Sequence, residues 1–358
     1  MKTLRIAGLA LGVALCSAAG NGDDGFLAFQ GVQEFAVLPD GVRFPEGITA
    51  DPSTGDIYVG TFDSAPGANN KLLRFGRNGR LIAHHDFGAA PLLGLAFDAD
   101  HGKVFILNFG ASKVQRIAAA FDASTTVETV ATIPIVGAPS PRSVANPDTS
   151  SDTITFGSSG FPAPNGMVFD HAGNLYVSDS FQGAVFRIDN ARTCATPCTL
   201  NLVSHDPLLA TAGFPPFGAN GLALNASETA LFIANTGDNR VLKMDVGTHA
   251  VSVFAESIHG ADGLLFEAST GRLWVAANQG DEVLALNDKG RVIARVGGFG
   301  GIRHDGTPRG LLFPASLVIQ GGSMFVTNLA LPLTAATGDE PEEDVTRWNV
   351  ARFPLPRR

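Results

Sequence analysis

The sequence predicts an all-β fold, a six-bladed β-propeller with four antiparallel strands in each blade. Three observations support this prediction. A strand–turn–strand motif recurs six times along the chain, a third short strand follows each copy, and no segment has the pattern of an amphipathic helix. The composition agrees, because 45% hydrophobic residues, 16% charged residues and 42 glycines are typical of a glycine-rich β protein with a large core.

Each copy of the motif consists of alternating apolar residues, a turn rich in Asp, Gly or Ser, and a second run of β-branched or aromatic residues. This pattern is typical of two antiparallel strands. The copies begin at Glu46, Gly94, Asn165, Asn220, Asp262 and Ser316. Third strands are expected at 71–75, 113–117, 184–189, 240–245, 282–287 and 349–353, and a fourth run follows most of them.

The sixth copy reaches only its third strand at the end of the chain. One additional strand, around 26–37, precedes the first copy. We therefore expect this N-terminal strand to be the outer strand of the last blade, where it closes the ring. On this interpretation, residues 26–358 form a single propeller domain, preceded by a linker at 20–25.

Two stretches interrupt the repeat. Residues 137–164, between the second and third copies, are rich in Ser, Pro and Gly and predict a loop or hairpin, and residues 297–314 precede the sixth copy. Both are expected on the face where the first strand of each blade begins, where they could wall a pocket. Surface loops without such a role are the alternative.

The N-terminus has the layout of a secretory signal peptide at 1–19: two basic residues, an apolar run at 6–15, and small residues near Ala19. We therefore expect a periplasmic or secreted protein. The apolar run is too short to span a bilayer and no later segment is long enough, so an integral membrane protein is not expected. A lipid anchor on Cys16 is the alternative, but Leu15 is unsuited to the position before such a cysteine.

The other two cysteines, Cys194 and Cys198, close a short loop. In an oxidising compartment, with no histidine or second cysteine pair nearby, they predict a disulfide rather than a metal site. A nucleic-acid partner is not expected, because the net charge is −9 and Lys and Arg do not cluster. The chain also lacks the G-x-S-x-G elbow of serine hydrolases and a glycine-rich phosphate loop.

The first residues of the six copies carry the functional information. In a propeller the first strand of each blade lines the central channel, so these residues converge at one mouth of the channel. Four of them are oxygen donors: Glu46, Asn165, Asn220 and Asp262. Calcium takes about six to eight oxygen ligands, whereas zinc and copper favour His or Cys, which lead no blade here. We therefore predict a site for Ca²⁺ or another divalent cation. The alternative is that Asn-Gly and Asp-Gly only turn the chain into each strand.

This set resembles the calcium-dependent propeller family of regucalcin, the gluconolactonases and related lactonases. In that family a Glu in blade one, an Asn in blade three, an Asn in blade four and an Asp in blade five hold the metal. The matching residues are Glu46 in FPEG, Asn165 in APNG, Asn220 in GANG and Asp262 in GADG. The resemblance implies hydrolysis of a lactone or ester, in which the cation polarises the carbonyl and Asp262 is the general base.

The chain departs from the sugar-lactone members, which carry an Arg two residues before the blade-three Asn, because Ala163 is found there. Phenylalanines instead precede the first residues of several copies: Phe44, Phe161, Phe214, Phe217 and Phe313. A rather hydrophobic ester or lactone is therefore predicted, with Phe161, Phe214 and His259 as candidate substrate-binding residues. Packing between blades is the alternative for the phenylalanines, and a surface position is the alternative for His259.

A second class of function is also compatible with the sequence. An exported propeller without catalytic activity could use the same channel mouth, or its outer strands, to bind a protein or a glycan. The four oxygen donors favour the enzyme, since a binding scaffold has no need of them.

Overall fold

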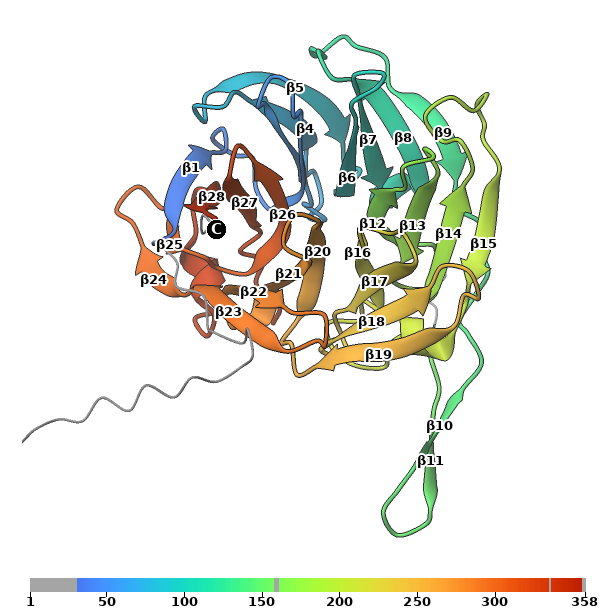
Figure 1. Cartoon of the computed structure of the whole chain (residues 1–358). Helices are drawn as coiled ribbons and strands as arrows, with labels where there is room; N and C mark the ends of the chain where they lie inside the picture. The colour runs from blue at the N-terminus through green and yellow to red at the C-terminus, as the bar shows by residue number, and fades with distance from the viewer. Residues whose placement is uncertain (1–30, 158–160, 335, 356–358) are drawn as a thin grey trace, which may run out of the picture.

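The computed structural model describes residues 31–157, 161–334 and 336–355. Within these residues the chain forms six four-stranded antiparallel sheets around a central channel, which confirms the predicted six-bladed propeller (Figure 1). Two two-stranded sheets and four short 3₁₀-helices complete the described secondary structure. In the same residues, no helix has the length and apolar character that a membrane span requires.

The first four blades follow one another along the chain. Blade one contains β2 (Pro45–Ala50), β3 (Ile57–Thr61), β4 (Asn70–Phe75) and β5 (Leu81–Gly88). Blade two contains β6 (Leu92–Asp98), β7 (Lys103–Asn108), β8 (Lys113–Ala118) and β9 (Glu128–Thr132). Blade three contains β12 (Pro164–Phe169), β13 (Leu175–Asp179), β14 (Ala184–Ile188) and β15 (Leu200–Ser204). Blade four contains β16 (Ala219–Leu224), β17 (Ala230–Asn235), β18 (Arg240–Asp245) and β19 (Val251–Glu256).

The last two blades complete the ring. Blade five contains β20 (Ala261–Glu267), β21 (Arg272–Ala277), β22 (Glu282–Leu286) and β23 (Val292–Gly297). Blade six contains β26 (Pro314–Gln320), β27 (Ser323–Asn328), β28 (Asn349–Pro354) and, outermost, β1 (Gln33–Val37). Because β1 pairs with β28, the N-terminal strand closes the last blade, as predicted. The predicted signal peptide, Cys16 and the first residues of the expected N-terminal strand lie outside the described residues.

The blades pack against one another through apolar side chains, and this packing explains the patterning of the strands. The second strands, such as β3 and β17, are buried along their whole length because both faces contact neighbouring blades. The outer strand β5 instead alternates half-buried and exposed residues, which is the pattern of a strand with one solvated face. Between blades five and six, the rings of Trp274 and Phe353 are fully buried, with their centroids 6.4 Å apart.

Each blade has a β-bulge near the start of its first strand. In blade three, Pro164 lies opposite Asp179 and Met167 lies opposite Val177, so β12 carries one extra residue over this stretch. The same irregularity occurs at Pro45/Ile48, Leu92/Leu95, Ala219/Leu222, Ala261/Leu264 and Pro314/Leu317. A bulge re-aims the side chain that it contains. The bulge therefore explains how a polar residue can begin an otherwise buried strand.

The register corrects the predicted first residue in two blades. The pairs Leu92 with Asn108 and Pro314 with Asn328 match the pair that opens blade three. Leu93 and Ala315, rather than Gly94 and Ser316, therefore occupy the position of Asn165. Gly94 and Ser316 correspond to the glycine that follows it.

That following residue is Gly in five blades because the inner strands approach closely. A Cβ atom on Gly166 would lie 2.4 Å from the backbone oxygen of Asn220, and one on Gly221 would lie 2.3 Å from the backbone oxygen of Asp262. Both distances are too short for any side chain. Only glycine therefore fits where these inner strands approach one another at the axis.

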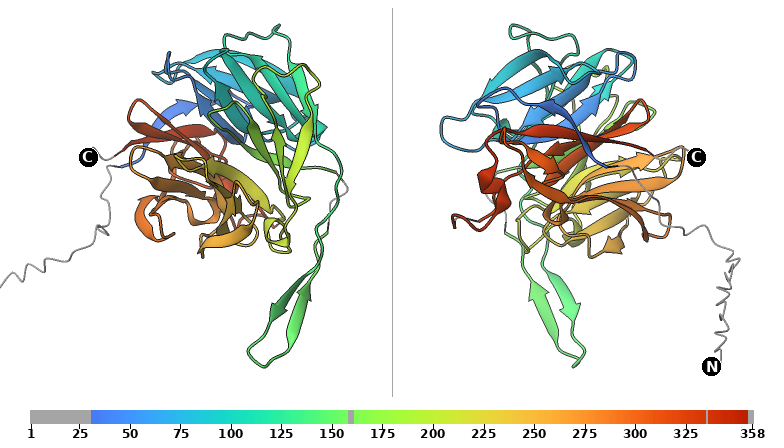
Figure 2. Two further views of the ribbon diagram at one scale, coloured as in Figure 1. Left: turned by 45° about the vertical axis from the view of Figure 1, so that its right-hand side comes forward. Right: turned by 90° about the vertical axis from the view of Figure 1, so that its left-hand side faces the viewer.

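The two predicted insertions both form two-stranded sheets. In the first, β10 (Arg142–Ala145) and β11 (Ser151–Ile154) form a hairpin that projects from the body of the propeller (Figure 2). In the second, β24 (Phe299–Ile302) pairs with β25 (Pro308–Gly310). The 3₁₀-helices are η1 (Phe109–Ala111), η2 (Pro207–Leu209), η3 (Asn278–Gly280) and η4 (Pro341–Asp344). Cys194 and Cys198 form the predicted disulfide.

Candidate functional site

The four predicted metal ligands line one cavity at the mouth of the channel. They come from the first strands of blades one, three, four and five: Glu46, Asn165, Asn220 and Asp262. Each of the four side chains is 4–5% exposed. The space between the lining side chains is open to solvent and measures about 410 Å³.

The carboxamide groups of Asn165 and Asn220 are each held by a hydroxyl group from their own blade. Asn165 Nδ2 donates to Ser180 Oγ at 3.0 Å, and Asn220 Nδ2 donates to Thr236 Oγ1 at 2.9 Å. Each hydroxyl donates its single hydrogen to a backbone carbonyl of the next blade at 2.7 Å, so it can only accept from the amide. The amide nitrogens therefore face the hydroxyls, which leaves the Oδ1 atoms as donors of electron pairs to a ligand.

Asp262 is held in a comparable way. Asn278 Nδ2 donates to Asp262 Oδ2 at 3.0 Å, while Asn278 Oδ1 is buried without a hydrogen-bond partner. Burial raises the pKa of Asp262 to about 7, against hydrogen bonds from Asn278 and Asn220 that lower it. In the protein without a cation, this carboxyl group is thus partly protonated near neutral pH.

Glu46 comes from blade one, and the other residues that blades one and two contribute to the cavity wall, Phe62 and Leu93, are apolar. Its Oε2 atom is buried and has no hydrogen-bond partner. Burial, together with the nearby charge of Asp262, raises the pKa of Glu46 well above its ordinary value. A buried carboxylate oxygen without a partner is costly, and a bound cation would supply the missing partner.

The donor set fits a hard divalent cation. Two carboxylates and two carboxamides offer only oxygen atoms, which Ca²⁺ prefers, and further positions can be taken by water or substrate. Among the described residues, no group of three or more His, Cys, Asp or Glu side chains could hold a metal. The candidate site contains two such residues, and its other two donors are asparagines.

A second ring of residues surrounds the first and divides the mouth into two halves. It consists of the residues that directly follow the second strand of each blade: Phe62, Phe109, Ser180, Thr236, Asn278 and Leu329. In blades three to five these residues are polar and hydrogen-bond the ligand of their own blade. In blades six, one and two they are apolar. The second-ring residues of one half can therefore orient polar groups, whereas those of the other half offer only apolar contact.

Only some of the predicted aromatic and histidine residues lie at this cavity. Phe217 and Phe313 line the cavity. Phe161, which is 44% exposed, contacts Phe181 at 5.5 Å between ring centroids, and Phe181 contacts Phe217 at 5.3 Å, so Phe161 lies at the rim. Phe214, at 59% exposure, does not line the cavity, although the next residue, Pro215, does.

Three other predicted positions lie away from the cavity wall. Phe44 is buried against Trp348, with 4.9 Å between ring centroids, and belongs to the core. Ala163, where an Arg would grip a sugar lactone, is fully buried, and its N–H donates to Asp179 at 3.0 Å. His259 is exposed in a different cavity, with Arg240 and Glu256, so the structure does not bring it to the four ligands.

Sequence reasoning missed Ser180, Thr236 and Asn278. Their signal was present, because each directly follows the second strand of a blade whose first strand carries a ligand. It also missed Leu331 and Leu333, which line the cavity from a connection in blade six that has no counterpart in the repeat.

No protein-family model matches the sequence, and no curated protein matches it. Solved structures do match. A luciferin-regenerating enzyme is 14% identical with a TM-score of 0.61, covering 90% of this chain and 94% of its own. Regucalcin from Agrobacterium tumefaciens str. C58, a calcium-binding protein, is 15% identical with a TM-score of 0.59, covering 92% and 98%. A gluconolactonase from Xanthomonas campestris is 14% identical with a TM-score of 0.54, covering 89% of each chain.

The chain shares their six-bladed fold. The predicted resemblance is thus confirmed at the level of architecture. Because a fold hosts many activities, function has to be argued from the residues of the site.

Proposed function

We propose that this protein is a calcium-dependent hydrolase of a lactone or an ester. One observation carries the proposal: four oxygen donors from four blades converge in a single cavity, and one of them, Glu46, has a buried oxygen without a partner. The same fold in a calcium-binding protein and in a gluconolactonase supports it. Another divalent cation with similar ligand preference is the alternative occupant.

Each ligand has a role in this proposal. When bound, the cation polarises the carbonyl of the substrate and stabilises negative charge that develops on its oxygen. Asp262 takes the proton of the attacking water and returns it to the leaving oxygen when the ring or ester C–O bond breaks, giving a carboxylic acid and an alcohol. Asn278 fixes the orientation of Asp262 through its hydrogen bond to Oδ2. Glu46, Asn165 and Asn220 act as ligands only.

We also propose that the substrate is rather hydrophobic. Eight apolar residues line the cavity: Phe62, Leu93, Pro215, Phe217, Phe313, Leu329, Leu331 and Leu333. No Lys, Arg or His is among the described residues that line it, and the position of the sugar-lactone Arg holds the buried Ala163. A charged or polyhydroxylated substrate would find few partners there.

We further propose that the protein works in the periplasm or outside the cell. The arrangement of residues 1–19 supports export, and so does the disulfide between Cys194 and Cys198, since structural disulfides persist in oxidising compartments. Detection of the mature protein in a periplasmic or culture-medium fraction, with cleavage near Ala19, tests this point.

A panel of lactones and aryl esters, assayed with calcium and with chelator, tests the activity. We expect turnover that is lost with chelator and restored by calcium, and a fall of about 10²–10⁴-fold in kcat for Asp262→Asn, because the base is removed. Asp288→Asn is the matched control, since Asp288 is exposed in the same blade. If calcium binds and no member of the panel is hydrolysed, the hydrolase proposal is wrong.

A non-catalytic propeller that binds a protein or glycan is the rival proposal. It predicts that partner binding survives both chelation and Asp262→Asn. The buried, unpartnered oxygen of Glu46 favours the enzyme, because a scaffold gains nothing from an uncompensated buried carboxylate at its axis.

A further inference from the structure

Blade six has a long connection between its second and third strands. In blades two to five this connection is four residues long, at 109–112, 180–183, 236–239 and 278–281, whereas in blade six it covers 329–348. Its first part, 329–333 with the sequence LALPL, is called the leucine segment below. Leu329, Leu331 and Leu333 all line the cavity that contains the four candidate ligands.

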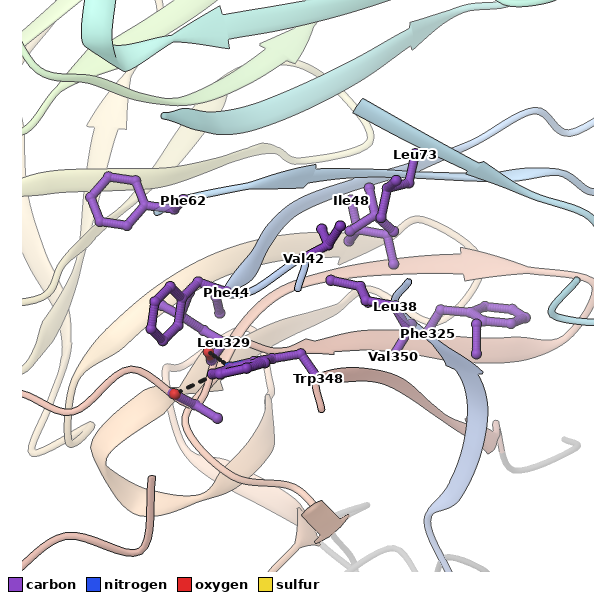
Figure 3. Close-up of a cluster of buried hydrophobic side chains, with 14 of the residues drawn as sticks. Leu38, Val42, Phe44, Ile48, Phe62, Leu73, Phe325, Leu329, Trp348 and Val350 are labelled. Carbon is purple, nitrogen blue, oxygen red and sulfur yellow. Dashed lines mark hydrogen bonds between the residues drawn. The ribbon is translucent and has the colours of Figure 1, made fainter. Parts of the chain in front are cut away.

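Several hydrogen bonds hold the leucine segment in place. The N–H of Leu329 donates to the backbone oxygen of Phe313 at 3.1 Å. Trp348 Nε1 donates to the backbone oxygens of Leu329 at 3.1 Å and Ala330 at 3.4 Å (Figure 3). At the other end, Glu340 Oε2 accepts from the N–H of Leu333 at 2.7 Å. The leucines are therefore a fixed wall of the cavity.

The backbone of the leucine segment also carries strain. Ala330 has a φ of 42°, in the left-handed region that residues other than glycine and asparagine rarely adopt. Such a conformation persists only where the surrounding structure fixes it, and it is common in segments that form ligand sites. Here full burial of Ala330 and the bond from Trp348 to its oxygen provide that constraint.

The leucine segment faces the apolar half of the mouth. Phe62, Leu93 and Phe313, from blades one, two and six, complete that part of the cavity lining, and Phe217 adds an apolar ring from the connection into blade four. The ligand-orienting residues Ser180, Thr236 and Asn278 belong to the opposite blades, three to five. A substrate whose carbonyl meets the four donors therefore has an apolar wall available for the rest of its structure.

Five of the six charged residues that follow the leucine segment in this connection are acidic, and the sixth, Arg347, pairs with Asp40. The same connection continues with Asp339, Glu340, Glu342, Glu343 and Asp344. A substituent that carries a carboxylate or phosphate would be repelled by these residues and would find no Lys, Arg or His side chain among the described residues of the cavity wall. A neutral apolar substituent meets neither obstacle.

We propose that the leucine segment is the subsite for an apolar substituent, and that the substrates are neutral lactones bearing an alkyl or aryl group on the ring. This inference rests on the proposed function and specifies its substrate class. Burial of the substituent is then the source of selectivity, and unsubstituted lactones are poor substrates.

A homologous series tests the inference: γ-butyrolactone and its 4-alkyl derivatives up to octyl, assayed with saturating calcium. In the unaltered protein, each added methylene should raise kcat/KM by about fourfold until the cavity is filled. In Leu331→Ala/Leu333→Ala, the ratio of kcat/KM between the octyl-bearing and unsubstituted lactones should fall by about 10–100-fold. Leu202→Ala, an exposed leucine of β15 in blade three, is the matched control and should keep the ratio.

A binding measurement separates this inference from the proposed hydrolysis. The corresponding 4-alkyl γ-lactams resist hydrolysis, so their dissociation constants, measured by calorimetry with calcium present, report the subsite alone. Tighter binding with chain length in the unaltered protein, lost in the double variant, supports the subsite even if no lactone is hydrolysed. If chain length changes neither the lactam affinity nor kcat/KM, or if the double variant keeps the same dependence, the inference is overturned.

Discussion

Among the four candidate ligands, Glu46 is the one that a bound cation would stabilise most. The other three ligands each donate to or accept from a neighbour, whereas Glu46 Oε2 is buried with no partner. The raised pKa of Glu46 has a consequence for stability. Because the pKa of Glu46 is higher in the folded protein than in the unfolded chain, protonation of this carboxyl group favours folding. This stabilisation is fully present below pH 4.5, the ordinary pKa value, and is lost as the pH rises toward the folded pKa.

We therefore predict that Glu46→Gln stabilises the protein in chelator and destabilises it in calcium, relative to the unaltered protein. At pH 8 with chelator, the variant should be more stable than the unaltered protein by about 1–3 kcal/mol, since no buried charge has to form. With excess calcium, the unaltered protein should be the more stable one, because only it binds the cation tightly. Thermal unfolding under both conditions measures this, with Asp152→Asn in the exposed β11 as a control for net charge. A variant less stable than the unaltered protein in chelator contradicts the prediction.

Gly166 is one of the glycines at which the inner strands approach each other closely. An added Cβ would meet the backbone oxygen of Asn220 at 2.4 Å, and backbone atoms cannot move aside cheaply. We predict that Gly166→Ala lowers the free energy of unfolding in urea by about 1–3 kcal/mol and weakens calcium binding by shifting Asn220. Gly157→Ala is the control, because nothing lies within 4 Å of its Cβ position. Equal stability of the two variants would show that the strands can separate.

The sequence allowed the convergence of the four candidate ligands to be predicted, because these residues differ between copies of a motif that is otherwise constant. Asn165 could be placed at the axis from its position in the repeat alone, without any long-range contact. The residue that orients Asn165 could not be predicted in this way. Ser180 accepts from Asn165 because its own hydroxyl hydrogen is donated to a backbone oxygen of the next blade, and this contact exists only once the blades are assembled into the ring. The one-residue errors at Leu93 and Ala315 have a similar cause: the bulge, not the glycine, fixes the position.

An ion pair joins the third and fourth strands of blade two, and its contribution to the stability of the protein depends on pH in the acid range. Arg116, in β8, donates to both carboxylate oxygens of Glu128, in β9, at 2.7 and 2.9 Å. Hydrogen bonding by Arg116 lowers the pKa of Glu128 from 4.5 to about 2, against partial burial. A lowered folded pKa stabilises the protein above the unfolded value, and this stabilisation is lost as pH falls from about 4.5 to about 2.

We predict that Glu128→Gln removes this acid-dependent part of the stability. Above pH 5 the variant should be less stable by about 1 kcal/mol, because Glu128 is 39% exposed and solvent screens the pair. Near pH 2 the difference should vanish. Urea unfolding at several pH values measures it, with the exposed Glu256→Gln as the control. A difference that is constant from pH 2 to pH 7 would contradict the assignment to this pair.

Of the two unusual connections between strands, one was predicted from the sequence and the other was not. The insertion at 137–164 was recognisable because it lengthens one interval of the repeat, and it forms the β10–β11 hairpin. The leucine segment was not recognised, because LALPL lies between the expected second and third strands of blade six and contains no polar residue that would indicate a site. Its role depends on Trp348 and Glu340, which fold back onto it from 7–19 residues later in the sequence.

Closure of the ring holds Glu46 opposite the polar half of the mouth. The pairing of β1 with β28 joins the start of the chain to its end. The ring of Phe35, in β1, packs edge-on against Phe325 at 4.7 Å between centroids and is 8% exposed. Since blade one follows β1 directly along the chain, loosening this contact would let blade one move relative to blades three to five.

We predict that Phe35→Ala lowers the free energy of unfolding by about 3–5 kcal/mol, the usual cost of such a cavity. We also expect a several-fold weaker affinity for calcium, although no ligand is altered, because a fraction of the protein would then hold Glu46 away from the other donors. Urea unfolding and calcium titration by calorimetry measure the two effects, with the exposed Phe214→Ala as the control. Unchanged calcium affinity in a destabilised Phe35→Ala would mean that the four donors are held by their own blades rather than by closure of the ring.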